Sequence, residues 1–271
     1  MIKLLAEEYL NLYSFLNLFN FITFRTGAAI LTSLFFSLIF GEMIINSLSK
    51  FQPIGQPIRI DGPENHIIQK SGTPTMGGIL IILSIITSLF LWSDLSNKYV
   101  WIGIFTLISF GTIGIIDDYK KIKFNSSQGL RGRTRIFFQI IICFIIIFFI
   151  INNLNEKIGT TIAFPFFKNF VIDFGIFYFF IGIFIILGSA NSVNLTDGLD
   201  GLAIVPVMIV AMSFAFIAYL SGNIFFAEYL LISYIPGSGE LSVFCGALIG
   251  SALGFLWFNA PPAKVFMGDT G

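Results

Sequence analysis

The sequence predicts an all-α membrane protein with about seven spanning helices. Of its 271 residues, 56% are hydrophobic and only 11% are charged, whereas an average soluble domain has about 25% charged residues. The mean hydropathy is +0.89. The charges are clustered, and they leave uncharged stretches close to the roughly 20 residues that a helix needs to cross a bilayer. A soluble fold could not bury this much apolar surface, so the class is a polytopic membrane protein.

Seven apolar stretches are long enough to cross the hydrocarbon core. They cover residues 24–46, 76–94, 99–116, 136–153, 171–190, 202–220 and 243–260. Residues 1–20 are predicted to form an interfacial helix, because Tyr9, Tyr13 and Phe15 suit the headgroup zone. We expect residues 1–271 to form a single integral membrane domain.

The distribution of basic residues predicts the orientation. The connections after the first, third and fifth spans share one side with the segment after the seventh. That side holds Lys50, Arg59, Lys70, Lys120, Lys121, Lys123, Arg131, Arg133, Arg135 and Lys264. The other side holds Lys3, Arg25, Lys98, Lys157 and Lys168. The positive-inside rule places the richer side in the cytoplasm, so the N-terminus is expected to be external.

Four polar, glycine-rich segments fall on the predicted cytoplasmic side. They are RIDGPENHIIQKSGTPTMGG (59–78), DDYKK (117–121), NSVNLTDGLDGLA (191–203) and NAPPAKVFMGDTG (259–271). The external connections carry no comparable segment. The sequence therefore predicts one active site, assembled from several loops at the cytoplasmic face.

Asp117 and Asp118 stand where the third span meets the cytoplasm. The simplest interpretation is an ordinary interfacial stop, in which the lysines that follow extend toward water. If the helix continues through the pair, the two side chains point about 100° apart, because a turn takes about 3.6 residues. In that case we expect the two acids to have separate roles.

Asp197 and Asp200 are three residues apart, and at the start of a helix they would share a face. Thr196 or Asn194 could cap that helix. A purely structural alternative is that acids in a first turn complement the helix dipole. That alternative does not explain why Asn191 and Asn194 accompany both aspartates between two apolar spans.

Asp269 completes a set of five aspartates on the predicted cytoplasmic face. Its neighbours Gly268 and Gly271 would let backbone amides approach a ligand. Mg²⁺ is usually held by one or two carboxylates together with phosphate oxygens, and lysines and arginines neutralise phosphate. A transporter would place such acids near the middle of the bilayer. An enzyme that acts on a lipid phosphate is therefore favoured over a transporter or a non-catalytic scaffold.

Several other functions are disfavoured by what the sequence contains. His66 is the sole histidine, so a histidine-based zinc site or a Ser/His/Asp triad is not expected, and His66 is interpreted as a loop residue. Cys143 and Cys245 lie in apolar runs and read as small buried side chains. The net charge of zero gives no bulk attraction to nucleic acid. Phe266 either packs or stacks on a base.

The four segments resemble the phospho-N-acetylmuramoyl-pentapeptide-transferase (MraY) family. The resemblance rests on KSGTPTMGG (70–78), DDYKK (117–121), NLTDGLDGLA (194–203) and FMGDTG (266–271). The family belongs to the polyprenyl-phosphate N-acetylhexosamine-1-phosphate transferases, and GTPTMGG separates it from relatives that transfer N-acetylglucosamine phosphate. The sister reaction with UDP-GlcNAc as donor remains the nearest alternative.

The resemblance implies the reaction and its setting. The family moves phospho-MurNAc-pentapeptide from UDP-MurNAc-pentapeptide to undecaprenyl phosphate, which gives UMP and lipid I for peptidoglycan synthesis, and it requires Mg²⁺. It also implies ten helices, an external N-terminus, the bacterial inner membrane and a homodimer. For the chemistry, direct attack by the lipid phosphate is favoured over a covalent aspartyl intermediate.

The resemblance also implies roles for individual residues. Asp269 would be the Mg²⁺ ligand, Asp117 would lie nearest the lipid phosphate, and Asp118 would support the diphosphate and metal region. Lys70 and Phe266 would contact the uridine, with Phe266 stacked on uracil. The implied substrate-binding residues are Lys70, Thr75, Lys121, Lys123, Arg133, Asn194, Asp197, Leu199, Asp200 and Phe266.

One feature departs from the family. The family continues past FMGDTG with three more helices and a histidine-rich motif, whereas this sequence ends at Gly271. We therefore expect the sequence to be partial at its C-terminus, and we expect the 271-residue chain to be inactive when it is expressed alone.

Overall fold

The computed structural model describes residues 2–3, 9, 13–53, 55, 72–124, 129–153, 159–163, 171–197 and 200–271. Lys70, His66 and Leu199 lie outside the described residues. In chain order the elements are η1 (Ser14–Asn20), α2 (Ile22–Phe51), α4 (Gly78–Trp92), α5 (Lys98–Lys123), α6 (Gly132–Asn153), β1 (Thr161–Ala163), β2 (Val171–Asp173), α7 (Phe177–Thr196), α8 (Ile204–Ser221), α9 (Ile224–Leu230) and α10 (Glu240–Asn259).

The predicted class, an all-α polytopic membrane protein, is confirmed. Each of the seven predicted spans coincides with a helix. Six of these helices, α2, α5, α6, α7, α8 and α10, are long and apolar enough to cross a membrane. The seventh, α4, has 15 residues and is shorter than an ordinary span. Within the predicted interfacial helix, the structure describes a 3-10 helix, η1, over Ser14–Asn20.

The fifth span begins later than predicted because its expected first residues form a strand. β2 pairs with β1 in an antiparallel ladder, with Ile172 opposite Ile162. Asp173 Oδ1 accepts hydrogen bonds from Thr160 Oγ1 at 2.6 Å and from Gly175 N at 2.9 Å. Gly175 has a φ of +48°, a conformation that glycine adopts at no steric cost and that ends the strand. α7 then begins at Phe177.

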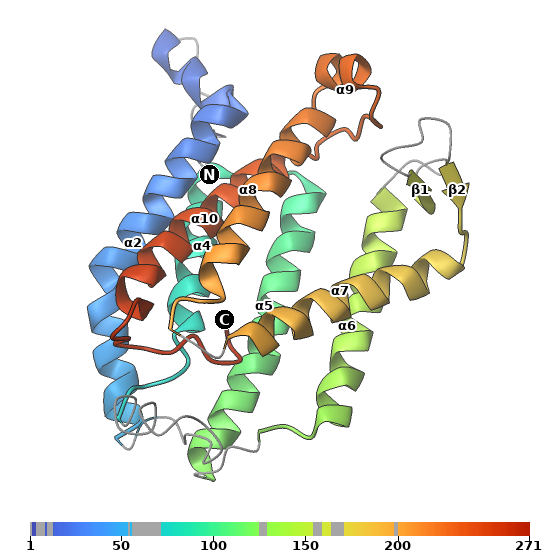
Figure 1. The fold of residues 1–271 in the computed structure, drawn as a ribbon. Coiled ribbons are helices and arrows are strands. Elements are labelled where there is room, and N and C mark those ends of the chain that lie inside the picture. The colour runs from blue at the N-terminus through green and yellow to red at the C-terminus, as the bar shows by residue number, and fades with distance from the viewer. Residues whose placement is uncertain are drawn as a thin grey trace.

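The core of the described structure is centred on α2, α4 and α10, which lie side by side (Figure 1), and α5 and α8 add a few residues to it. Small residues make the contact between α2 and α10 close. Gly246, Gly250 and Gly254 recur every fourth residue and so share one face of α10. A β-carbon at Gly250 would overlap the carbonyl oxygen of Ile30, and one at Gly254 would overlap the side chain of Ser37. The two backbones therefore approach as in other small-residue contacts between membrane helices.

A buried ion pair joins the same three helices at one end of the bundle. Arg25 donates to Glu240 through two hydrogen bonds, Nη1 to Oε2 at 2.7 Å and Nη2 to Oε1 at 2.6 Å. Arg25 Nη1 also donates to the carbonyl of Trp92 at 3.3 Å, and Asp94 N donates to Glu240 Oε2 at 3.0 Å. Both charged side chains are buried and each is paired with the other, as charges inside membrane proteins generally are, although Arg25 Nε has no hydrogen-bond partner among the described residues.

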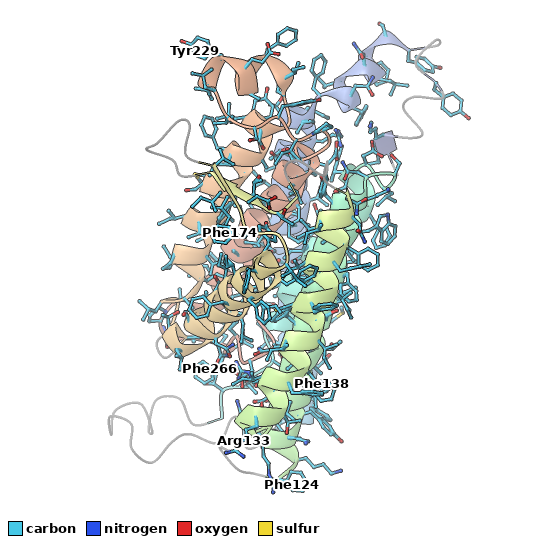
Figure 2. All side chains as sticks on the ribbon, turned by 90° about the vertical axis from the view of Figure 1, so that its right-hand side faces the viewer. Phe124, Arg133, Phe138, Phe174, Tyr229 and Phe266 are labelled. Atoms are coloured by element: carbon cyan, nitrogen blue, oxygen red, sulfur yellow. The ribbon has the colours of Figure 1, made fainter. Side chains whose placement is uncertain are left out.

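The remaining helices leave most of their surface uncovered. α7 runs obliquely across α6 in Figure 1, and none of its residues, all of them described, is buried. Its exposed side chains include Phe180, Phe184 and Leu195. α9 and the two strands lie at the end of the molecule opposite the loop of residues 259–271. Figure 2 shows the same two ends of the molecule, with Tyr229 at one end and Arg133 and Phe124 at the other.

Candidate active site

α5 continues through Asp117 and Asp118 and ends only at Lys123, so the interpretation as an ordinary interfacial stop is wrong. The two carboxylates are 3% and 0% exposed. Lys120, Lys121 and Lys123 occupy the last turn, where positive charge complements the helix dipole. The acids are therefore held inside the protein by a rigid helix, where water does not solvate them.

Asp118 holds the loop of residues 266–271. Its Oδ2 accepts hydrogen bonds from Thr270 N at 3.0 Å and from Thr270 Oγ1 at 2.7 Å. Its Oδ1 accepts one from Asp269 N at 3.2 Å. A carboxylate that accepts several such bonds fixes the backbone that donates them. Asp118 thereby sets the place of Asp269, which follows in the same loop.

Asp117 binds a different part of the chain. Its Oδ1 accepts a hydrogen bond from Leu130 N at 2.6 Å, just before α6, and its Oδ2 lies 2.7 Å from Lys121 Nζ. A β-carbon at Gly129 would overlap the carboxylate, so the segment before α6 passes directly over it. Apart from Lys121, which lies near both, the two adjacent acids bind different segments of the chain, and separate roles for them stay a prediction.

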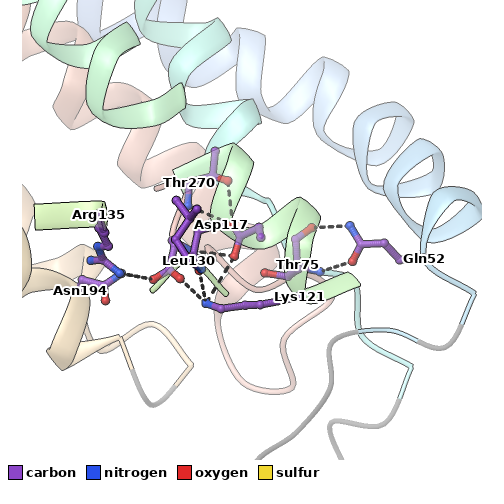
Figure 3. Close-up of polar contacts among 10 residues, drawn as sticks. Gln52, Thr75, Asp117, Lys121, Leu130, Arg135, Asn194 and Thr270 are labelled. Carbon is purple, nitrogen blue, oxygen red and sulfur yellow. Dashed lines mark hydrogen bonds and ion pairs between the residues drawn. The ribbon is translucent and has the colours of Figure 1, made fainter. Parts of the chain in front are cut away.

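Lys121 lies among three carboxylates (Figure 3). Its ammonium group is paired with Asp269 and with Asp117, and it lies 4.0 Å from Asp118 Oδ1. Asp269 also accepts a hydrogen bond from Asn194 Nδ2. The cluster therefore joins α5, α7 and the 266–271 loop around the ammonium group of Lys121.

The pKa of Asp269 is well below its usual range. Burial alone would raise this pKa, but hydrogen bonds with Asp117, Lys121 and Asn194 outweigh the burial and lower it. Asp269 is therefore a carboxylate at neutral pH, in the protonation state that a metal ligand needs.

The acid cluster has the composition of a site for a hard divalent cation. Among the residues that the structure describes, Asp117, Asp118 and Asp269 each offer a carboxylate oxygen, and these oxygens lie within 4.8 Å of one another. Carboxylate oxygens are the ligands that Mg²⁺ prefers. The donor set therefore fits the ion that the sequence analysis expected.

The segment of residues 73–78 supports the 266–271 loop from the other side. Phe266 N donates to Pro74 O at 2.9 Å, and Gly77 N donates to Phe266 O at 2.9 Å. Thr75 is 1% exposed, and its Oγ1 has no hydrogen-bond partner among the described residues. The placement of Thr75 at a substrate site stays a prediction.

Two predicted phosphate partners lie away from the cluster. Lys123 is exposed, with its Nζ 6.0 Å from the ring centroid of Tyr119, and Arg133 is exposed on α6. Arg135, which the sequence analysis did not select, reaches the site instead, with its Nη1 3.6 Å from Asp269 Oδ1. Residues two apart on a helix point about 200° away from each other, so Arg133 and Arg135 cannot both face the acids.

The connection after α7 differs from the expected helix start. α7 includes Asn194 and ends at Thr196, whose hydroxyl donates to Val193 O at 2.7 Å inside that helix. Asp197 and Asp200 lie in the connection, and α8 starts only at Ile204. The predicted cap by Thr196 or Asn194 is therefore wrong, because the polar residues belong to the end of one helix.

The predicted convergence of the four segments is confirmed for their described residues. The 73–78 and 117–121 segments both contact the 266–271 loop, and Asn194 contacts Asp269. Gly201 N donates to Asn259 Oδ1 at 2.9 Å, and Asn259 Nδ2 donates to Val265 O at 2.9 Å. Gln52, Arg135 and Thr270 also belong to this network, although the sequence analysis selected none of them as a site residue.

Comparisons with known proteins agree with this arrangement. The profile of the Glycosyl transferase family 4 matches residues 100–271, and the Phospho-N-acetylmuramoyl-pentapeptide-transferase signature 1 matches residues 70–82. A protein of Pelagibacter ubique (strain HTCC1062), named phospho-N-acetylmuramoyl-pentapeptide-transferase, is 52% identical over 271 residues. The match covers 100% of this chain and 75% of that protein.

Proposed function

This chain belongs to the phospho-N-acetylmuramoyl-pentapeptide-transferase family, and on that premise we propose that it makes lipid I. It would transfer phospho-MurNAc-pentapeptide from UDP-MurNAc-pentapeptide to undecaprenyl phosphate and release UMP. The observation that carries this proposal is the buried cluster of Asp117, Asp118 and Asp269 around Lys121 at one end of an apolar helix bundle. With a divalent cation bound, such a site would neutralise phosphates at a membrane surface.

The reaction needs little proton transfer. An oxygen of undecaprenyl phosphate attacks the phosphorus that carries the sugar, and the bond from that phosphorus to the oxygen of UMP breaks. Both the attacking and the leaving phosphate are anions at neutral pH, so positioning and charge neutralisation supply most of the catalysis. We propose this direct attack, without a covalent aspartyl intermediate.

Asp269 would hold the Mg²⁺, and Asp117 would lie nearest the lipid phosphate. The bound ion would neutralise the diphosphate and stabilise the departing UMP. Asp118 would act differently, because both of its oxygens already accept hydrogen bonds from Asp269 and Thr270. Its role would be to position the loop that carries Asp269.

The cationic side chains divide into two groups. Lys121 and Arg135 lie in the cluster and would bind phosphate oxygens of the substrates. Lys123 and Arg133 are exposed, and as phosphate partners they would meet substrate only at the rim of the site. Both assignments are proposals.

The nucleotide would bind beside the metal. We propose that Phe266 stacks on uracil and that Lys70 and Thr75 contact the uridine end. Asn194, near the end of α7, would surround the nucleotide and metal together with three residues that follow α7, which are Asp197, Leu199 and Asp200.

The protein would work in the bacterial inner membrane with its site toward the cytoplasm. Six apolar helices make it a multi-pass membrane protein. The last turn of α5, beside the site, carries Lys120, Lys121 and Lys123, and positive charge collects on the cytoplasmic ends of spans. A homodimer stays a prediction.

The test measures lipid I and UMP made by the natural full-length protein in detergent with UDP-MurNAc-pentapeptide, undecaprenyl phosphate and Mg²⁺. We expect Asp269→Asn to lower kcat by about 100-fold or more, as loss of one charge-stabilising group commonly does. Asp94→Asn, at the opposite end of the bundle, is the control and should stay active. If Asp117→Asn and Asp269→Asn leave Mg²⁺-dependent UMP release unchanged, the acid cluster does not carry the reaction. A wild-type protein that releases no UMP would favour a transporter or a scaffold. Faster turnover with UDP-GlcNAc would identify the sister reaction.

A further inference from the structure

We propose that Gln52 is a positioning residue for the metal and nucleotide side of the site. Gln52 follows the last residue of α2 and is 2% exposed. Its side chain is hydrogen-bonded to Thr75, so its influence on the loop that carries Asp269 would pass through the segment of residues 73–78. The inference rests on the proposed function, because it assigns Gln52 a part in that reaction.

The first step is the pairing of Gln52 with one peptide unit. Thr75 N donates to Gln52 Oε1 at 2.9 Å, and Gln52 Nε2 donates to Thr75 O at 3.2 Å. The side-chain amide thus satisfies both backbone groups of Thr75, as a neighbouring strand would. Because both partners are buried, water cannot replace these bonds if the amide is lost.

The end of α2 anchors Gln52 in turn. Gln52 N donates to Leu48 O at 2.9 Å, and Gly55 N donates to Gln52 O at 3.0 Å. A β-carbon at Gly55 would lie 2.8 Å from the backbone of Gly72, so the two segments touch just before Thr75. The amide is therefore fixed to a long helix and fixes the 73–78 segment to that helix.

The second step leads from Thr75 to the loop of Asp269. Pro74, directly before Thr75, and Gly77, two residues after it, pair with Phe266 through Pro74 O and Gly77 N. Gly78 N donates to Met267 O at 3.0 Å. Gly268 follows Met267 and lies close to Thr75. A β-carbon on Gly268 would be 2.6 Å from Thr75 Oγ1. A shift of Thr75 would therefore displace the backbone next to Asp269.

Loss of the Gln52 amide should leave a smaller fraction of molecules in which the loop of residues 266–271 is positioned to bind metal. Apparent affinity falls in proportion to the fraction of protein in the competent conformation. Two buried hydrogen bonds are lost with the amide, and we expect a roughly tenfold weaker affinity for metal. The affinity for undecaprenyl phosphate should change little. Asp117, which would lie nearest the lipid phosphate, is held by Leu130 and Lys121.

The test compares Gln52→Met with Ser88→Ala in the natural full-length protein in detergent. Ser88→Ala is the matched control, because Ser88 Oγ donates to Ala29 O at 2.9 Å and is also a buried link between α4 and α2. Mn²⁺ binding is measured by electron paramagnetic resonance, which does not depend on activity. Gln52→Met should raise the Mn²⁺ Kd about tenfold, and Ser88→Ala should leave it unchanged.

Kinetics then separate positioning from loss of stability. Gln52→Met should raise the KM for UDP-MurNAc-pentapeptide about tenfold and leave the KM for undecaprenyl phosphate within about twofold. If Gln52→Met does not fold, Gln52→Asn replaces it, since its amide is one methylene too short for the pair. A lower Tm with an unchanged Mn²⁺ Kd and unchanged KM values would overturn the inference. An inactive wild-type protein whose Mn²⁺ Kd still depends on Gln52 would instead count against the proposed function.

Discussion

Gly268 lies directly against the carboxylate of Asp118, so that a β-carbon on Gly268 would be 2.5 Å from Asp118 Oδ2. The backbone amides of the next two residues donate to the same carboxylate. Asp118 thus holds the loop of residues 266–271 at one point, and the absence of a side chain on Gly268 leaves room for the carboxylate of Asp118. Asp118 has this loop as its partner, while its neighbour Asp117 binds the segment before α6.

Gly268→Ala should therefore strongly reduce activity. The residue has a φ of +74°, which alanine adopts only with strain, and its β-carbon would push against Asp118 and Thr75. We expect kcat to fall by about 100-fold, because a misplacement of about 1 Å can have that effect. Lipid I formation measures it. Gly27→Ala is the control, since a β-carbon at Gly27 meets nothing within 4 Å, and wild-type-like activity of Gly268→Ala would contradict the crowding argument.

Lys121→Gln should change metal affinity and turnover in opposite directions. The ammonium group of Lys121 occupies the centre of the three carboxylates, so a divalent cation competes with its charge. Removing that charge should tighten Mn²⁺ binding about three- to tenfold and lower kcat about 100-fold, because a phosphate partner is also lost. Titration of Mn²⁺ and steady-state kinetics measure the two effects. Weaker Mn²⁺ binding by the variant would show that Lys121 supports the metal site.

Gly250→Ala should destabilise the protein without altering its chemistry. The added methyl group would overlap the carbonyl of Ile30, which is backbone and cannot rotate away. Overpacking of this kind costs about 1–3 kcal/mol. Thermal unfolding in detergent should show a lower Tm, whereas Gly188→Ala on α7 should not, because a β-carbon at Gly188 meets no atom within 4 Å. Equal Tm values for the two variants would mean that α2 and α10 can move apart enough to admit the methyl group without loss of stability.

The ion pair of Arg25 and Glu240 should be far more sensitive to loss of one partner than of both. Arg25→Met leaves Glu240 buried without its cation, and removing one member of a buried pair costs about 3–5 kcal/mol. The double change Arg25→Met with Glu240→Leu should recover most of that loss, because no buried charge remains. Tm values of the single and double variants provide the measurement. A double variant less stable than Arg25→Met would show that the pair contributes net stability.

Much of the fold could be predicted because hydropathy is a local property. Each of the seven apolar stretches became a helix, and span alternation placed the four glycine-rich segments together. The strand at residues 171–173 was missed, since β2 depends on its partner β1 and on the bonds of Asp173. A run of apolar residues does not distinguish a short strand from the start of a helix.

The sequence by itself determined the class, the spans, the motif-bearing segments and the acids, because residue type, spacing and apolar length are enough to specify them. Only the tertiary structure decided which side chains complete the cluster. It selected Arg135 over Arg133, through the rotation of α6, and it tied Gln52 to Thr75 and Thr270 to Asp118. Asp118 and Thr270 are 152 residues apart in sequence. Contacts at that separation depend on how helices pack, which no local pattern records.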